Sequence, residues 1–205
     1  MALALFDFDG TISTRDSFLA FLWFSSRSRF LVTLSWRFFH VARYLAKKFP
    51  NSQLKEEFLC GIVKGMAIGQ FRRQAAIFCE AAIPAMIRPQ FWETLQHHQK
   101  QRDKIVIITA TPREILEPWC EQHELEILGT ELELDRECRI TGKIAGLNCM
   151  GEEKVRKIKE FYNIPTPEEI FAYGDSDSDL PMLALAAPPN RFFKPFRTPG
   201  PSVPR

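Results

Sequence analysis

Two aspartates near the N-terminus have a spacing that suits catalysis by paired carboxylates. Asp7 and Asp9 follow a short apolar run at residues 3–6, and Gly10 marks a turn directly after them. Side chains two residues apart on an extended chain point the same way. The two carboxylates could therefore share one divalent cation, or divide the roles of nucleophile and acid/base between them. An exposed turn after an edge strand is the alternative for these residues taken alone.

A second polar segment follows an apolar, β-branched run at residues 104–109, which predicts a buried parallel strand that ends in the hydroxyl of Thr109. Pro112 suits the first turn of a helix over residues 113–123. The Thr109 hydroxyl and the neighbouring N–H groups, including that of Ala110, could then receive a phosphoryl oxygen near a helix N-terminus. As an alternative, Thr111 caps the helix and Thr109 merely ends the strand.

A lysine in the first turn of the helix predicted from Gly151 to about Tyr162 is a third candidate. Lys154 gains nothing from the helix dipole at this end, so a nearby anion would explain its position. Before this helix, residues 125–128 predict a strand and the alternating residues 131–147 predict a hairpin. Lys143, eleven residues before Lys154 in this hairpin, is the rival for the same role.

An acidic loop follows the strand predicted over residues 169–173. Its aspartates, Asp175, Asp177 and Asp179, begin like a calcium-binding EF-hand loop. Such a loop needs glycine at its sixth position and glutamate at its twelfth, where this chain has Leu180 and Ala186. A magnesium site fits better, with Asp175 at the end of a strand and Asp179 orienting the ligands.

The motifs DFDGT, VIIT, Lys154 and GDSDSD come in an order that resembles the four motifs of the haloacid dehalogenase-like phosphatase superfamily. Residues 148–155 resemble the third motif of its phosphoserine-phosphatase-like branch, subfamily IB. The resemblance implies an α/β fold: a Rossmann-like parallel sheet with an all-helical cap inserted between the first and second motifs. On this basis residues 1–15 and 87–197 would form the core, 16–86 the cap and 198–205 a disordered tail.

The resemblance also implies a role for each candidate. Asp7 would attack phosphorus to form an aspartyl-phosphate, and Asp9 would act as acid and base. Mg²⁺ would bind Asp7, the main-chain oxygen of Asp9 and Asp175, and Asp179 would support these ligands. The phosphoryl oxygens would contact Thr109, Ala110 and Lys154.

The predicted cap has an unusual composition, because residues 17–55 contain no Asp or Glu. Basic and aromatic residues alternate along it, as in segments that lie on anionic membranes. The alternative is a structural cap whose aromatic face packs on the core while its cations are solvated. The cations are Arg27, Arg29, Arg37, Arg43, Lys47, Lys48 and Lys55.

The same cap bears on the substrate. Asp16 stands where phosphoserine phosphatases carry a glutamate that holds the substrate amine, and no segment matches their substrate arginine. The basic, aromatic cap is more similar to that of phosphatidylglycerophosphatase C. We therefore predict a magnesium-dependent phosphomonoester hydrolase acting on a lipid phosphate, with Asp16 in the substrate site. The alternatives are a soluble phosphatase for a phosphoserine-like or sugar phosphate, a non-catalytic binding module, and a nucleic-acid-binding cap.

Length and composition limit the number of domains and the classes of partner and compartment that we expect for this protein. The 205 residues allow one core domain with an insert, and a net charge of +2 does not indicate a nucleic-acid partner. Five cysteines without a CxxC spacing suit a reducing cytosol. Without a signal peptide or membrane span, we expect a cytoplasmic protein with peripheral contact at the inner face of a membrane. The adjacent His97 and His98 are expected on the surface, because neighbouring helical residues face different ways.

Overall fold

A six-stranded sheet forms the centre of the chain in a computed structural model, which describes residues 2–36, 51–164 and 166–196. The strand order is β4-β3-β2-β1-β5-β6, and every pair is parallel except β3 and β4. This confirms the predicted Rossmann-like α/β class. The strands are β1 (Leu3–Phe6), β2 (Lys104–Pro112), β3 (Glu126–Leu134), β4 (Ile140–Ala145), β5 (Ile170–Gly174) and β6 (Arg191–Phe193).

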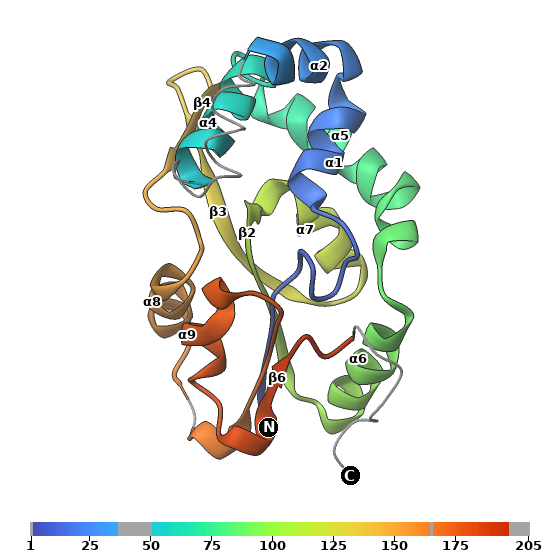
Figure 1. Cartoon of the computed structure of the whole chain (residues 1–205), viewed down its shortest axis with the longest axis vertical. Coiled ribbons are helices and arrows are strands. Elements are labelled where there is room, and N and C mark those ends of the chain that lie inside the picture. Colours follow the sequence, from blue (N-terminus) through green and yellow to red (C-terminus); the bar gives the residue numbers. More distant parts are fainter. Residues whose placement is uncertain (1, 37–50, 165, 197–205) are drawn as a thin grey trace.

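Both faces of the central strands are buried, which explains why their sequences are apolar throughout. Leu3 and Leu5 of β1 belong to one hydrophobic cluster, together with α8 (Glu152–Phe161) and α9 (Leu180–Leu183). Ala4 and Phe6 belong to the cluster on the other face, with α6 (Pro89–Gln101) and α7 (Arg113–Gln122). Figure 1 shows these two helix pairs on opposite sides of the sheet.

Between β1 and α6 the described residues form helices that gather toward one end of the molecule, here called the helical region (Figure 1). They are α1 (Ser17–Ser25), α2 (Arg27–Trp36), α4 (Asn51–Ile62), α5 (Ile68–Ala81) and a short 3-10 helix, Ile83–Met86. Asp16 caps α1, because its Oδ1 accepts a hydrogen bond of 2.8 Å from Leu19 N–H. The division into a core and a cap at residues 16–86 stays a prediction. Residues 37–50 and the tail at 198–205 lie outside the described residues.

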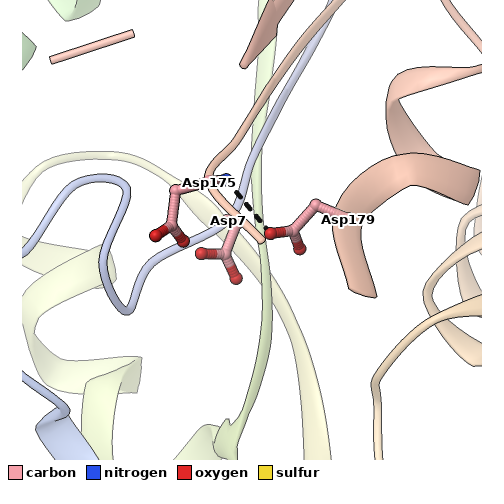
Figure 2. Close-up of side chains that lie close together, drawn as sticks. All are labelled: Asp7, Asp175 and Asp179. Carbon is pink, nitrogen blue, oxygen red and sulfur yellow. Dashed lines mark hydrogen bonds between the residues drawn. The ribbon is translucent and has the colours of Figure 1, made fainter. Parts of the chain in front are cut away.

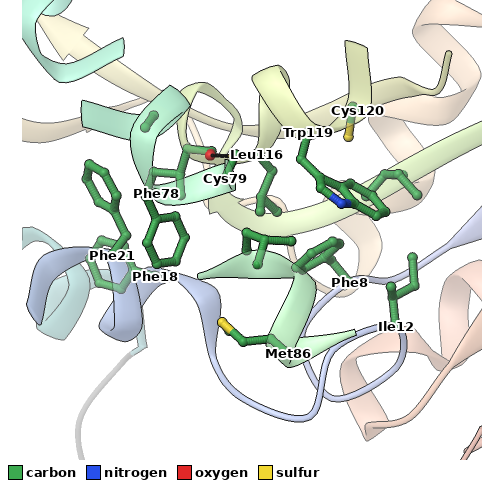
Figure 3. Packing of buried hydrophobic residues seen from close by; sticks show 14 of the residues in the cluster. Phe8, Ile12, Phe18, Phe21, Phe78, Cys79, Met86, Leu116, Trp119 and Cys120 are labelled. Carbon is green, nitrogen blue, oxygen red and sulfur yellow. Dashed lines mark hydrogen bonds between the residues drawn. The ribbon is translucent and has the colours of Figure 1, made fainter. Parts of the chain in front are cut away.

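The helical region packs on the core through one continuous hydrophobic cluster. Figure 3 shows Phe21 of α1 and Phe78 of α5 near Leu116 of α7, with Phe8 against Trp119. Tightly packed apolar side chains therefore join the helical region to the sheet and its helices. Within the described residues, no helix is both long and apolar enough to cross a membrane.

The structure differs from expectation at β3. We predicted a strand over residues 125–128 and a separate hairpin over 131–147, but one strand runs through both, pairing with β2 along its first half and with β4 along its second. Gly129 does not break it. A Cβ at this glycine would lie 2.9 Å from Arg113 Cβ, so glycine permits the close approach of α7.

The surface position expected for His98 is wrong. Its side chain is 1% exposed, with Nδ1 2.9 Å from Asp103 Oδ2 and Nε2 2.9 Å from the Tyr173 hydroxyl. His98 lies on the buried face of α6 with Phe91, Thr94 and Leu95. Burial becomes acceptable because both ring nitrogens have polar partners.

Candidate active site

The site is built where β1 and β5 end. Phe6 pairs with Ile107 and Tyr173, and Asp7 N–H donates a hydrogen bond of 2.9 Å to the Tyr173 carbonyl. Asp7 thus emerges beside the loop that follows β5. Carboxylate oxygens of Asp7, Asp175 and Asp179 all lie within 4.8 Å of one another (Figure 2). The parallel register brings together residues that are more than 160 positions apart in the sequence.

Gly10 allows this convergence. Its φ is +86°, a conformation that favours glycine, and a Cβ here would lie 2.6 to 2.9 Å from the Asp175 carboxylate. The next residue, Thr11, places its hydroxyl 3.0 Å from Asp7 Oδ2 and 3.3 Å from Asp175 Oδ1. The Gly-Thr pair of DFDGT therefore makes room for Asp175 and supplies a donor to the carboxylates.

Lys154 is the cation of this cluster. Its Nζ lies 2.6 Å from both Asp7 Oδ1 and Asp179 Oδ1, and the residue is 1% exposed. Burial disfavours the ammonium, but the two carboxylates outweigh this and raise the Lys154 pKa above its ordinary value. The rival lysine, Lys143, is exposed on β4 and does not line the cavity.

The ionisation of Asp7 is finely balanced. Burial raises the pKa of Asp7 to about 7, Lys154 opposes this shift, and the Asp179 charge adds to it. A divalent cation would favour the ionised form, as a nearby opposite charge does. The ionised form of Asp7 therefore depends on the positive charge around it.

The Asp9 carboxylate does not belong to the cluster of Asp7, Asp175 and Asp179. Its Oδ1 accepts a hydrogen bond of 2.7 Å from Ser17 N–H, at the start of α1, and its Oδ2 accepts one of 2.7 Å from the Thr111 hydroxyl. Burial raises the Asp9 pKa to about 6, repulsion from Asp16 adds to the shift, and the two donors oppose it. A carboxyl with this pKa suits proton transfer near neutral pH.

The end of β2 differs from the prediction in its details. Thr109 is fully buried, and its Oγ1 accepts a hydrogen bond of 3.0 Å from Thr111 N–H. The cavity is lined by Ala110 and Thr111 instead. Thr111 does not cap α7, because β2 continues through Pro112, which itself occupies the N-cap position. Sequence reasoning missed Thr111 because its hydroxyl matched the pattern of a helix cap.

Asp179 is held by many donors. Its Oδ2 accepts hydrogen bonds from the N–H groups of Asp175 and Ser176 and from the Ser176 hydroxyl, at 3.1, 3.0 and 2.8 Å. Figure 2 shows the first of these bonds. Oδ1 faces Lys154, so both oxygens have strong partners. Asp179 is thus placed to orient the Asp175 loop and Lys154.

The carboxylates open onto a cavity of about 820 Å³ between the sheet and the helical region. This size is ordinary for a small-molecule site. The helical region contributes both apolar and charged groups to its wall. These are Asp16, Phe18, Leu19, Leu54, Lys55 and Phe58.

Lys55 is buried, which contradicts its predicted place on a basic surface of the cap. It is only 6% exposed, and its Nζ donates hydrogen bonds to the Ala110 carbonyl and, at 3.0 Å, to Asn148 Oδ1. Among the described residues no carboxylate pairs with it. Burial lowers the Lys55 pKa to about 8, against the charges of Asp16 and Asp9. The Lys55 Nζ also lies 5.5 Å from the centre of the Phe18 ring, so within the described residues neutral groups hold the ammonium and its positive charge remains in the cavity wall.

Asp16 is both the N-cap of α1 and a residue of the cavity wall. Its carboxylate caps α1, yet the residue also lines the cavity, on the side of the helical region. Of the other predicted cap cations, Arg29 donates to the Ile62 carbonyl at 3.1 Å, and Arg27 lies 5.5 Å from the centre of the Trp23 ring. Arg37, Arg43, Lys47 and Lys48 lie outside the described residues.

The donor set fits a hard divalent cation. Carboxylate oxygens are the ligands that Mg²⁺ prefers, and Asp7 and Asp175 present them at one point. The close approach of Asp175 past Gly10, which has no side chain, supports the same conclusion. The Asp9 carboxylate accepts hydrogen bonds from Ser17 and Thr111 and is not one of the three clustered carboxylates.

Residues 4–184 match the sequence pattern of the family described as haloacid dehalogenase-like hydrolase. The chain belongs to this family. Protein CicA of Caulobacter vibrioides is 34% identical over 191 residues, which cover 90% of this chain and 82% of that protein. A histidinol-phosphatase of Neisseria meningitidis is 28% identical over 128 residues, covering 60% of this chain and 56% of the relative.

Solved structures of other proteins share the fold. A Bordetella pertussis protein of unknown function superposes with a TM-score of 0.72 at 21% identity, covering 91% of both chains. A substrate-bound phosphoserine phosphatase gives a TM-score of 0.58 at 15% identity, covering 90% of this chain and 82% of its own. At these identities the likeness concerns the fold alone.

Proposed function

We propose that this hydrolase is a magnesium-dependent phosphatase that cleaves phosphomonoesters through an aspartyl-phosphate on Asp7. The observation that carries the proposal is the position of Asp7: Lys154 contacts one of its carboxylate oxygens, and the Asp175 carboxylate lies in the same cluster. The Asp9 pKa of about 6 suits the acid and base role. The phosphatase name of one relative agrees with it.

The residues would divide the reaction as follows. The Asp7 carboxylate attacks phosphorus, and the bond to the leaving oxygen breaks as that oxygen takes the proton of Asp9. Asp9 then accepts a proton from water, whose oxygen attacks the phosphoryl group and releases phosphate and Asp7. Lys154 and the Ala110 N–H would contact the phosphoryl oxygens, and the buried Thr109 hydroxyl would hold the Ala110–Thr111 turn in place.

Mg²⁺, held by Asp7, Asp175 and the Asp9 main-chain oxygen, would neutralise phosphoryl charge during transfer. Asp179 would orient both Lys154 and the loop that carries Asp175. This assignment agrees with the hydrogen bonds that already occupy both Asp179 oxygens.

The substrate must also match the cap side of the cavity. Lys55 adds a cation and Asp16 an anion there, so the leaving group would carry polar atoms close to the phosphate. We propose a lipid phosphate, with a soluble amino-acid-like or sugar phosphate as the alternative. Peripheral contact with an anionic membrane fits the exposed apolar side chains of α2, where Leu31, Val32 and Trp36 are 52%, 57% and 85% exposed.

A non-catalytic binding module is the other class. It would not need a nucleophile, an acid/base and a charge-neutralising lysine kept together in one cavity. Asp7→Asn separates the two classes. We expect it to abolish Mg²⁺-dependent hydrolysis of 4-nitrophenyl phosphate while the far-UV circular dichroism and melting temperature stay close to wild type. Full activity in this variant would refute the mechanism, and an inactive wild type would favour the binding module.

A further inference from the structure

A second cavity adjoins the catalytic one. It encloses about 790 Å³ among α1, the start of α2, the end of α5 and the following 3-10 helix. Asp16 and Leu19 line both cavities, so the two meet at the first turn of α1. A group bound at Asp7 could therefore extend past these two residues into the second cavity.

The second cavity is apolar over most of its wall. Nine of its twelve lining residues are apolar, and the three charged residues are Arg15, Asp16 and Arg27. One of these, Asp16, also lines the catalytic cavity, and Arg15 is its neighbour in the sequence. The apolar residues are Leu19, Ala20, Trp23, Phe24, Phe30, Phe78, Ala82, Ala85 and Met86. Figure 3 shows Phe78 and Met86 at the edge of the core.

Helix α1 leaves this wall partly open. Phe18, Phe21 and Leu22 are buried on its core side. Leu19, Trp23 and Phe24 are 41%, 39% and 41% exposed, although large apolar groups gain free energy when they are covered. A helix that is apolar all round is normally covered all round. Leu19 on this open face also lines the catalytic cavity, and small alanines at positions 20, 82 and 85 leave room beside the rings.

We infer that this second cavity, called the groove from here on, binds the hydrocarbon chain of the substrate. The enzyme would then select phosphate monoesters whose leaving group carries an apolar chain. The inference rests on the proposed phosphatase function and adds a specificity site to it. The ester head group would lie near Asp16, which lines both cavities, and the chain would contact the rings of Trp23, Phe30 and Phe78. Chain burial here would favour long substrates without any change at Asp7.

The test compares glycerol 3-phosphate with 1-acyl-glycerol 3-phosphates of increasing chain length, each below its micelle concentration so that no lipid surface is present. We expect kcat/KM to rise by up to roughly four-fold per buried CH₂ and then to level off. Ala85→Trp, which fills the groove, and Trp23→Ala, which removes one wall, should flatten this rise. Ala81→Trp and Trp36→Ala are matched controls, because both positions are exposed in the same helical region and neither lines the groove.

Equal kcat/KM along the series, or an unchanged rise in Ala85→Trp, would overturn the inference. If 4-nitrophenyl phosphate is hydrolysed normally in that case, the proposed phosphatase function survives. If the wild type hydrolyses nothing, calorimetry with methylphosphonate and decylphosphonate tests the groove directly. Tighter binding of decylphosphonate to the wild type, lost in Ala85→Trp, would support the inference. Equal affinity of the wild type for the two phosphonates would refute it. A dimer that Ala85→Trp dissociates would assign the groove to a second copy of the chain and refute the inference.

Discussion

The ammonium nitrogen of Lys154 lies 2.6 Å from Asp7 Oδ1, and both side chains are almost fully buried. The same nitrogen lies 2.6 Å from Asp179 Oδ1. One lysine therefore offsets the repulsion between two buried carboxylates and holds the proposed nucleophile in place. Its removal should affect folding as well as catalysis.

Lys154→Ala should lose most activity and lower the free energy of unfolding by roughly 3–5 kcal/mol, the range for breaking a buried ion pair from one side. Lys143→Ala, at an exposed position, should stay within about 0.5 kcal/mol of wild type and keep its turnover. Urea unfolding and hydrolysis of 4-nitrophenyl phosphate measure both effects. The reverse ranking would transfer the role to Lys143.

Asp9→Asn should slow turnover by roughly 10²- to 10⁴-fold, the usual contribution of a general acid or base. Mg²⁺ affinity measured by calorimetry should change less, because both side-chain oxygens of Asp9 are held by Ser17 and Thr111 and only the main-chain oxygen is proposed as a ligand. A large loss of Mg²⁺ binding would make the side chain a metal ligand instead.

Thr111→Val should change the pH profile. The Asp9 pKa is raised from 3.8 to about 6, and the hydrogen bond from Thr111 opposes the rise by favouring the carboxylate. Asp9 must be protonated to protonate an alkyl leaving group, so kcat/KM for an alkyl phosphate should fall as pH rises through this pKa. Without the Thr111 hydroxyl the pKa rises further, and the fall moves to higher pH. An unmoved profile would remove Asp9 or Thr111 from the proton transfer.

Lys55→Met should lower kcat/KM by about ten- to a hundred-fold, since a hydrogen bond to a charged group contributes roughly 1.5–3 kcal/mol. Lys55→Arg keeps the charge and should recover part of the loss. The control is Lys64→Met, an exposed lysine of the same helical region. Steady-state kinetics on an acyl-glycerol phosphate provide the measurement, and equal losses in the Met and Arg variants would show that charge is not what matters.

Binding to vesicles rich in anionic lipid should weaken as salt rises, since each cation close to such a surface contributes about 1 kcal/mol. Trp36→Ala should reduce this binding in a sedimentation assay and leave 4-nitrophenyl phosphate turnover unchanged, because Trp36 is 85% exposed on α2. Phe161→Ala, an exposed aromatic at the end of α8, is the control. If wild-type protein ignores these vesicles at low salt, a soluble substrate becomes the better choice.

The sequence determined the sheet class and the candidates at its edge. Apolar runs that end in Asp7, Thr109 and Gly174 predicted parallel strands, because such strands are buried on both faces. Strand ends of a parallel sheet meet at one edge, so the convergence of Asp7 and Asp175 could be expected from order alone. Lys154 could be named, with Lys143 as its rival, because residues 148–155 resemble the third motif of the family and because a lysine gains nothing from the dipole in the first turn of a helix.

Tertiary structure alone decided which polar side chains face the cavity. Thr109 and Thr111 look equivalent in sequence, yet the former is buried and the latter bonds to Asp9. Lys55 and His98 match the pattern of surface residues, but both are buried with partners from distant segments, Ala110 and Asn148 for one and Tyr173 for the other. Local periodicity gives the face of a helix, but whether a polar group on that face can be buried depends on acceptors and donors that other elements supply.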